Sequence, residues 1–189
     1  MGQPLSKLSL QEFLDWENQQ PERHEFHRGE VFAMVGARRV HGLIGLNIAA
    51  SLKSQLKGSP CRAFADSMKV RIAADTILYP DVFVTCDASD LRTDQVFTAP
   101  TLVVEVLSPS TQSYDRGSKF TLYRSIVSLR EYMLVDPDTR RVEGFRCGEQ
   151  GQWVFHDMSD GDALEAASVG AKVPLAEVFD GVDAAPAEG

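Results

Sequence analysis

Two acidic residues stand inside apolar stretches of the chain, where a carboxylate is costly unless it has a partner. Glu105 interrupts the run TLVVEVL, and Asp81 follows Pro80 in the run LYPDVFVT. Short β-branched runs are typical of interior strands buried on both faces, and an ionised carboxylate in such a strand needs a cation or a metal beside it. Glu105 is therefore either half of a structural ion pair with a core Arg or Lys, or part of a functional site. Asp81 either stabilises a turn after Pro80 or belongs to the same site.

The chemistry that suits these acids is metal-assisted hydrolysis of a phosphate ester. Magnesium prefers oxygen ligands, commonly one or two carboxylates together with waters and substrate phosphate oxygens. Asp81 and Glu105 on neighbouring strands can hold such an ion, which activates a water and neutralises charge on a phosphodiester. Lys119, on the next expected helix, would orient the water or stabilise the oxyanion. The alternative for Lys119 is a surface cation whose stem covers apolar area.

The elements that must position these residues follow from hydrophobic periodicity and turn signals. Ahead of Glu105 the pattern predicts a short helix over 9–17, a hairpin over 23–35, a long helix over 40–57, strands over 61–65, 68–72 and 78–85, and a loop over 88–98. The apolar stripe of the long helix consists of Leu43, Leu46, Ile48, Ala49, Leu52 and Leu56. Pro80 implies that the third strand is an edge strand, begins at that point or has a bulge there.

The pattern after Glu105 predicts a second helix and more strands. The expected elements are a helix over 115–126, a strand over 130–135, a hairpin over 141–147 and 152–156, and a weaker run over 164–178. With 189 residues, 43% of them hydrophobic, the chain suits one domain with a real core. We expect that domain to span residues 1–180 and an acidic, disordered tail to span 181–189.

Charge is distributed unevenly along the chain. The formal net charge is -8, yet residues 38–71 carry seven Lys or Arg and one acid, whereas residues 147–189 carry one Lys and nine acids. The basic stretch is either a face that contacts nucleic acid or a solvated helix face without a partner. Its seven cations are Arg38, Arg39, Lys53, Lys57, Arg62, Lys69 and Arg71.

The number of cysteines and the hydropathy of the chain indicate the cellular compartment in which we expect the protein. Cys61, Cys86 and Cys147 are odd in number and far apart, so we expect buried small hydrophobic residues rather than a disulfide framework. No apolar run approaches the roughly 20 residues that cross a bilayer, and the N-terminus lacks the apolar region of a signal peptide. These observations favour a cytoplasmic protein without a membrane segment.

The order of Pro80-Asp81 and then Glu105 resembles the PD-(D/E)XK signature of the restriction-endonuclease-like nucleases. The segments PERHEFHRGEVFAM, YPDVFV, PTLVVEVLSPST, YDRGSKFTLYRS and SLREYMLVDP are similar, in the same order, to those of one branch of that superfamily, the Uma family. The resemblance covers about residues 8–180. It implies an α/β fold with a mixed central β-sheet flanked by α-helices and additional antiparallel hairpins, and a divalent metal held by Asp81 and Glu105.

One position departs from the superfamily pattern. The lysine expected two residues after the glutamate is Leu107, which strand periodicity places on the same face as Glu105. Members of the family resemble this chain in carrying a lysine on the following helix, so the resemblance assigns the missing role to Lys119. It also implies that Glu25 is a third residue of the metal site. From the residues alone, Glu25 could point inward, but the residues favour a surface acid paired with Arg23 or Arg28.

The leading hypothesis is therefore a DNA endonuclease that depends on Mg²⁺ or Mn²⁺. Its catalytic residues are Glu25, Asp81, Glu105 and Lys119, and Asp81 and Glu105 hold the metal. A homodimer is expected, because a two-fold assembly matches a two-fold DNA site. Two alternatives stay open: a catalytically inactive member that binds nucleic acid or protein in a regulatory role, and a hydrolase of another phosphate ester.

Overall fold

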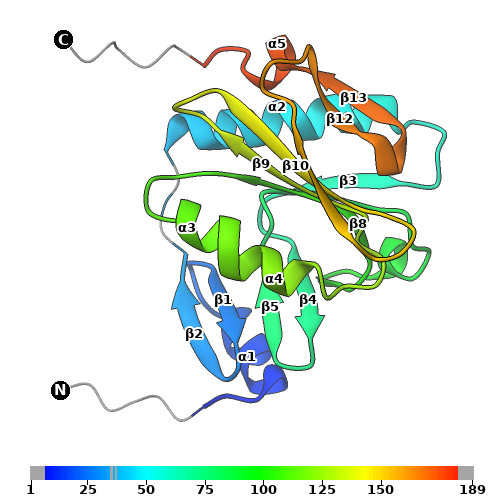
Figure 1. Cartoon of the computed structure of the whole chain (residues 1–189). Coiled ribbons are helices and arrows are strands. Elements are labelled where there is room, and N and C mark those ends of the chain that lie inside the picture. The colour runs from blue at the N-terminus through cyan, green and yellow to red at the C-terminus, as the bar shows by residue number, and fades with distance from the viewer. Residues whose placement is uncertain (1–6, 35, 37, 183–189) are drawn as a thin grey trace, which may run out of the picture.

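The computed structural model of the chain describes residues 7–34, 36 and 38–182, and its centre is a mixed six-stranded β-sheet (Figure 1). The strand order is β11-β10-β9-β8-β6-β3, in which β8 and β9 are parallel and the other neighbours are antiparallel. The strands are β3 (Arg62–Ala65), β6 (Val82–Thr85), β8 (Pro100–Val106), β9 (Glu131–Asp136), β10 (Arg141–Cys147) and β11 (Trp153–Asp157). The expected mixed sheet flanked by helices is confirmed.

Strand β8 is buried on both faces, as its continuous apolar run predicts. Val104 belongs to the core cluster that α2 (Arg39–Gln55) covers with Ile44, Ile48 and Leu52. Val103 and Leu107 face the opposite core cluster, which includes Tyr123 and Tyr132. Side chains alternate along a strand, so Glu105 faces this second cluster.

A second sheet of five strands lies on the Glu105 side of the first, in the order β2-β1-β5-β4-β7. Its strands are β1 (His24–His27), β2 (Glu30–Ala33), β4 (Lys69–Ala73), β5 (Thr76–Leu78) and β7 (Val96–Phe97). β1 and β2 form the expected hairpin, with Arg28 and Gly29 both at positive φ. Helix α1 (Leu10–Glu17) begins with the capping box of Ser9 and Glu12 and packs Phe13 against Phe26.

The strand expected over 78–85 is two strands in two sheets. The chain leaves β5 at Leu78, passes through Tyr79-Pro80-Asp81 and enters β6 at Val82. Pro80 has no amide hydrogen for a ladder, so it marks the point at which the chain passes from one sheet to the other. Asp81 therefore stands at the junction of the two sheets. The expected loop over 88–98 contains a 3₁₀ turn, η1 (Asp90–Arg92), and strand β7.

The second main helix is a composite of three pieces. It consists of α3 (Gln112–Tyr114), the π-helical turn η2 (Asp115–Lys119) and α4 (Phe120–Tyr123), which follow one another without a break (Figure 1). It starts before the expected residue 115 and ends before residue 126. The C-terminal run contains β12 (Ala163–Ala166), η3 (Ala167–Val169), β13 (Ala171–Pro174) and α5 (Leu175–Val178), and it packs on α2. The expected tail lies outside the described residues from 183 onward.

Two expectations are wrong, one about which face of the long helix is buried and one about the cysteines. Leu46, placed in the apolar stripe of the long helix, is 64% exposed, whereas Ile44 is fully buried. Cys61 and Cys86 form a disulfide. The register of β3 and β6 pairs Arg62 with Thr85, so the two cysteines are the next facing pair and their Cα atoms lie 4.0 Å apart. Separation along the chain concealed this pairing; Cys147 is free and half-buried.

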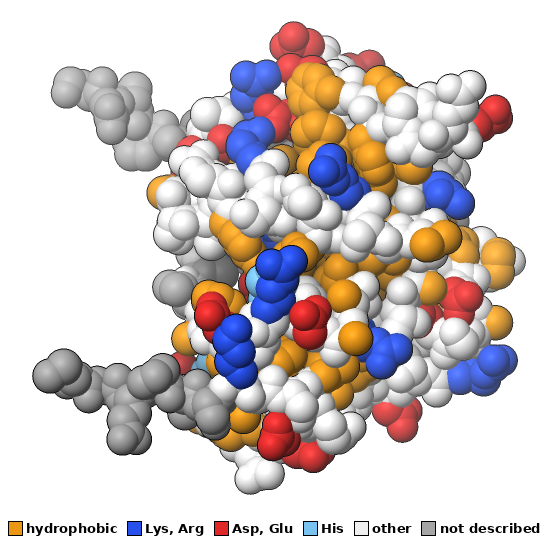
Figure 2. Space-filling model, turned by 60° about the horizontal axis from the view of Figure 1, so that its bottom comes forward, with side chains coloured by type: hydrophobic (Ala, Val, Ile, Leu, Met, Phe, Trp, Pro, Cys, Tyr) orange, Lys and Arg blue, Asp and Glu red, His pale blue; other side chains and the backbone are white. Residues whose placement is uncertain are grey.

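The basic stretch over 38–71 does not form one face. Lys53 lies in α2 on one side of the six-stranded sheet, and Arg71 lies in β4 of the other sheet. Lys69 is buried and donates a hydrogen bond to Asn18. On the side seen in Figure 2, basic and acidic side chains are interspersed. In the described part of the chain, no helix is long and apolar enough to cross a membrane.

The packing of α2 predicts different effects for two leucines of the same helix. Leu52→Ala removes a fully buried side chain and should lower the free energy of unfolding by about 2–5 kcal/mol through a cavity. Leu46→Ala, the matched control at an exposed position, should change it by less than about 0.5 kcal/mol. Urea denaturation followed by circular dichroism measures both. Equal losses would show that α2 is packed through a different face.

Candidate functional site

Three carboxylates converge on one buried ammonium group. Nζ of Lys119 lies 3.0 Å from Oε1 of Glu105, 3.3 Å from Oε1 of Glu25 and 3.6 Å from Oδ1 of Asp115. The side chain of Glu105 is 2% exposed and that of Lys119 is 9% exposed. Water therefore screens these charges little, and each depends on the others for compensation. We call these four residues the Lys119 cluster.

The Lys119 cluster joins three layers of the fold. Glu105 comes from β8 of the six-stranded sheet, and Glu25 comes from β1 of the second sheet. Asp115 and Lys119 are the first and last residues of the π-helical turn η2. π-Helical turns are rare and concentrate at functional sites. The placement of the turn brings a cation to the side of β8 that bears the acid.

Asp81 stands beside the cluster but has partners of its own. The register of β6 and β8 pairs Val82 with Val104, so Asp81 and Glu105 are the next facing positions. Oδ2 of Asp81 accepts a hydrogen bond of 2.7 Å from the Val106 amide. The Asp81 carboxylate thus acts as the hydrogen-bond acceptor for β8 at this point, because β6 begins only at Val82. Its Oδ1 lies 2.8 Å from Nε2 of His41, in the first turn of α2.

The cluster holds more acids than cations, and its pKa values reflect that imbalance. Burial would lower the pKa of Lys119, but Glu105 and the other carboxylates outweigh it and raise that pKa well above its usual range. Burial raises the pKa of Glu105 well above the ordinary carboxyl value, and Lys119 offsets only part of the rise. Burial likewise raises the pKa of Asp115. A single ammonium cannot neutralise every acid around it, so burial prevails at Glu105 and Asp115, whereas the carboxylates prevail at Lys119.

Asp81 and His41 form a second charged pair with the opposite tendency. Burial would lower the pKa of His41, but its contact with Asp81 raises it above the ordinary 6.5. Burial would raise the pKa of Asp81, but His41 and then Lys119 lower it below the ordinary 3.8. The pair therefore contributes fully to stability between pH 3.8 and 6.5. That contribution falls as pH drops through the folded pKa of Asp81 or rises through that of His41.

Several buried polar atoms at the site have no hydrogen-bond partner among the described residues. They are Oε1 of Glu105, the hydroxyl of Tyr123 and Nδ1 of His41. Oε1 of Glu105 is close to the Lys119 ammonium, yet the geometry is not that of a hydrogen bond. Buried polar atoms without partners are rare and call for an explanation such as a ligand.

The donor types fit a hard divalent cation, although the side chains as they stand do not enclose one. No three His, Cys, Asp or Glu side chains in the described part of the chain are arranged to hold a metal ion together. Magnesium, however, commonly takes only one or two carboxylates from the protein. The unpartnered oxygen of Glu105 and the excess of acids over cations suit such an ion.

The structure brings together three of the four residues singled out in the sequence and leaves the fourth beside them. Glu25, Glu105 and Lys119 are in direct contact, and Asp81 adjoins Glu105. Leu107, at the position where the superfamily pattern has a lysine, is buried in the second core cluster. Leu107 therefore serves the packing of the core, and the cation beside Glu105 comes from η2.

Two residues of the site were missed in the sequence. Asp115 lies four residues before Lys119, a spacing that signals a helical ion pair. His41, in the first turn of α2, carries no such signal in the sequence. Its partner Asp81 is 40 residues away, and the contact exists only because the start of α2 meets the junction of the two sheets.

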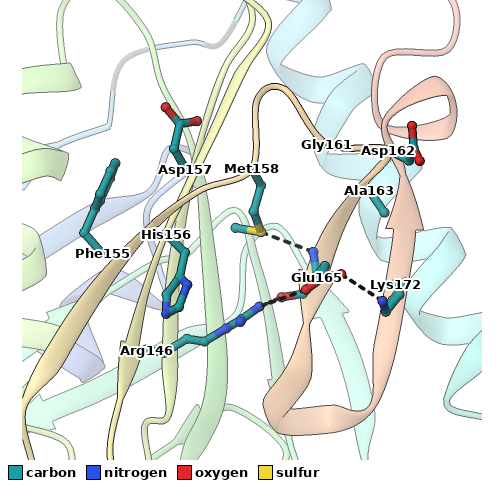
Figure 3. Close-up of a pocket in the computed structure, with 10 residues that line it drawn as sticks. All are labelled: Arg146, Phe155, His156, Asp157, Met158, Gly161, Asp162, Ala163, Glu165 and Lys172. Carbon is teal, nitrogen blue, oxygen red and sulfur yellow. Dashed lines mark hydrogen bonds and ion pairs between the residues drawn. The ribbon is translucent and has the colours of Figure 1, made fainter.

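A separate groove of about 630 Å³ lies between β11 and the pair β12–β13 (Figure 3). Glu165 is central to it and contacts Arg146 and Lys172. Arg146 also pairs with the buried Glu131 at 2.6 Å. None of the residues that line this groove belongs to the Lys119 cluster. Its two cations, Arg146 and Lys172, are both paired with Glu165, and we assign no role to the groove.

Comparisons with known proteins show the family and the fold of the chain. Residues 10–176 match the family model Uma2, described as "Putative restriction endonuclease". The chain is 36% identical over 180 residues to "Uncharacterized protein slr1290" of Synechocystis sp. (strain ATCC 27184 / PCC 6803 / Kazusa), covering 95% of each chain. It is 31% identical over 154 residues to "Uncharacterized protein sll1609" of the same strain, covering 80% of this chain and 87% of that one.

A solved structure gives the same architecture. The crystal structure of a "putative nuclease belonging to DUF820" from Anabaena variabilis ATCC 29413 superposes with a TM-score of 0.74 at 20% identity. The match covers 91% of this chain and 97% of that one. At this level of identity the likeness establishes the fold.

The His41–Asp81 contact predicts the titration of one imidazole. We expect His41 to titrate above 6.5 in the wild type and at a lower pH in Asp81→Asn, because burial then acts without the carboxylate. Histidine NMR signals followed against pH measure this. Asp157→Asn, which removes an exposed acid paired with Arg141, is the control and should leave the His41 titration unchanged. An unchanged His41 titration in Asp81→Asn would contradict the contact.

Proposed function

Because the chain belongs to the Uma2 family of restriction-endonuclease-like proteins, we propose that it is a metal-dependent DNA endonuclease acting at the Lys119 cluster. The observation that carries the proposal is the convergence of Glu105, Glu25 and Asp115 on Lys119, next to Asp81. A buried acid beside a buried cation at the junction of two sheets suits hydrolysis of a charged ester.

Asp81 and Glu105 are the residues that would hold the metal, Mg²⁺ or Mn²⁺. They face each other across β6 and β8, and carboxylate oxygens are the ligands such ions prefer. When bound, the ion would supply a polarised water and charge neutralisation at the phosphodiester. His41 keeps the Asp81 carboxylate ionised and oriented, because its contact lowers the pKa of that acid.

Lys119 acts as a donor and a charge rather than as a base. Its raised pKa keeps Nζ protonated at neutral pH, so it has no lone pair with which to accept a proton. An ammonium at this place can donate a hydrogen bond to the attacking water or to a phosphate oxygen and stabilise developing negative charge. Glu25 and Asp115 hold Nζ in position from opposite layers of the fold.

The start of α2 offers a place for the DNA backbone beside the site. Helix N-termini carry partial positive charge and favour phosphate groups. Arg38, the N-cap residue, carries a further positive charge, although it is paired with Asp138 at 2.8 Å. His41 fixes this end of the helix to Asp81. Contacts of this kind recognise the backbone without reading sequence, and a homodimer would present two such sites to the two strands.

A second candidate function is a non-catalytic binding protein that retains the fold. It is favoured by the apolar Leu107 within the core and by the lack of a ready three-ligand arrangement among the described residues. Such a protein would bind nucleic acid or a protein partner without metal. Calorimetry with Mg²⁺ separates the two candidates, because the binding protein would release or absorb no heat of metal binding.

The proposed function predicts metal-dependent cleavage of plasmid DNA. Wild-type protein with Mg²⁺ or Mn²⁺ should convert supercoiled plasmid to nicked or linear forms, and a chelator should stop the reaction. Glu105→Gln and Lys119→Met should each lower the rate about 100-fold or more, because each removes a charge that acts on the transition state. Agarose gels of timed samples give the rates.

The matched control is Glu30→Gln. Glu30 is an exposed acid in β2, a few residues after Glu25, and has no contact with the Lys119 cluster. Its substitution should leave the rate within about twofold, since surface changes of this kind are close to neutral. Cleavage that survives Glu105→Gln, or no cleavage by the wild type with either metal, would overturn the proposal.

A further inference from the structure

A row of apolar side chains crosses the six-stranded sheet and ends at its β11 edge. The pairing registers of neighbouring strands place one side chain of each strand opposite the next, on the face that carries Glu105. The members in the middle of the row are fully buried. From β3 to β11, the row consists of Phe64, Phe83, Val103, Tyr132, Phe145 and Phe155.

The two ends of this apolar row differ in how they are covered. At the β3 end, Phe97 of the second sheet lies against Phe64, with 4.7 Å between the ring centroids. At the β11 end, Phe155 lies 5.5 Å from the Phe145 ring but is 51% exposed. Its ring is turned away from Glu165 and the groove beside β11 (Figure 3). The row therefore stops at a strand edge with an aromatic ring half in water.

The backbone of β11 has an unused side at the same edge. The amide of Met158 donates a hydrogen bond to the carbonyl of Val142, and bonded pairs alternate along an antiparallel ladder. The register of β10 and β11 is unbroken, so the N–H and C=O groups of Trp153, Phe155 and Asp157 are directed away from β10. Among the described residues, no strand pairs with this side of β11.

We propose that this edge is a dimer interface, at which β11 pairs antiparallel with β11 of a second copy of the chain. Phe155 stands opposite the partner's Phe155, and a two-fold axis passes between them, perpendicular to the sheet. The two six-stranded sheets then form one continuous sheet. The inference assigns a surface to the homodimer, and it depends neither on a metal nor on cleavage of DNA.

Pairing centred on Phe155 uses every unused backbone group of both copies. In this register Trp153 stands opposite the partner's Asp157, so the residues that face one another are those whose N–H and C=O groups are free. A shift by one residue would set Phe155 opposite the partner's His156, whose backbone groups already bond β10. A shift by two residues would leave free groups of each copy unpaired. The backbone therefore favours the centred register.

The side chains fit the same register. The partner's Phe155 would extend the apolar row by one place and cover the exposed ring, because the Cα atoms of bonded facing residues lie about 5.5 Å apart. Val154, which is 45% exposed, would face the partner's His156 on the other side of the sheet. Asp157 would bring no unpaired charge to the interface, because it pairs with Arg141 at 2.7 Å.

Strand β11 lacks the features that keep an edge strand from pairing. Edge strands of monomeric proteins commonly carry lysine, proline or a bulge. β11 reads Trp-Val-Phe-His-Asp, and its register with β10 contains no shift. The opposite edge strand, β3, is shorter and is followed by Asp66 and Ser67, both at positive φ, which end it. Of the two edges of the sheet, β11 is the one suited to pairing.

Hydrogen exchange of the full wild-type chain tests the interface without a variant. The amides of Trp153, Phe155 and Asp157 should exchange about tenfold or more slowly in a concentrated sample than in a dilute one, because only the dimer bonds them. The amides of Val154 and His156 bond β10 in either state, so they are the internal control and should not change. NMR resolves the single amides. Equal exchange of the first three amides at both concentrations would overturn the inference.

Sedimentation equilibrium of two lysine variants locates the interface. Phe155→Lys places a charge at the centre of the proposed pairing and should raise the dissociation constant of the dimer at least tenfold. Leu46→Lys is the matched control: Leu46 is an exposed apolar residue of α2, and its change should leave the constant within about twofold. Both side chains are exposed, so both variants should fold, which circular dichroism checks. A wild type that stays monomeric at every concentration, or a dimer that survives Phe155→Lys unweakened, would show that β11 is not the interface.

Discussion

The constraint on which this structure depends is the cost of burying charge. Glu105 lies in a strand that is apolar on both faces, and a lone carboxylate there would be ionised only at great expense. Lys119 compensates that charge, but Lys119 is itself buried and also forms ion pairs with Glu25 and Asp115. The result is a cluster that links the six-stranded sheet, the second sheet and the helical segment. Removing one member would leave the others uncompensated, so the cluster also holds the layers together.

The second constraint is the break at Pro80. A single apolar run would have made one long strand, but a residue without an amide hydrogen divides it and directs its halves into different sheets. The consequence is local: Asp81 is the first residue after the break, and one of its carboxylate oxygens accepts a hydrogen bond from the Val106 amide. The other oxygen contacts the imidazole of His41 in α2. An irregular strand entry thus gathers residues from three elements around Glu105.

The sequence was informative where local rules and packing agree. The run around Glu105 predicted a buried strand, and Arg28-Gly29 predicted the hairpin that holds Glu25. The family and the mixed sheet followed from the resemblance and are confirmed. It was less informative where tertiary register decides. The Cys61–Cys86 disulfide, the exposure of Leu46 and the His41 contact each depend on which residue faces which across the fold. No local spacing encodes such pairings.

The departure at Leu107 has a physical consequence beyond a change of residue. A lysine at that position would extend from a strand whose ladder with β9 holds the backbone, so its ammonium would be tied to the sheet that carries Glu105. With Leu107 in the core, the cation comes instead from η2, a short irregular turn. Acid and cation then belong to different elements, and their distance can change without breaking the sheet. A comparison of position 107 alone with the superfamily pattern finds that the lysine is missing. In the folded chain, Lys119 of η2 supplies the positive charge beside Glu105 instead.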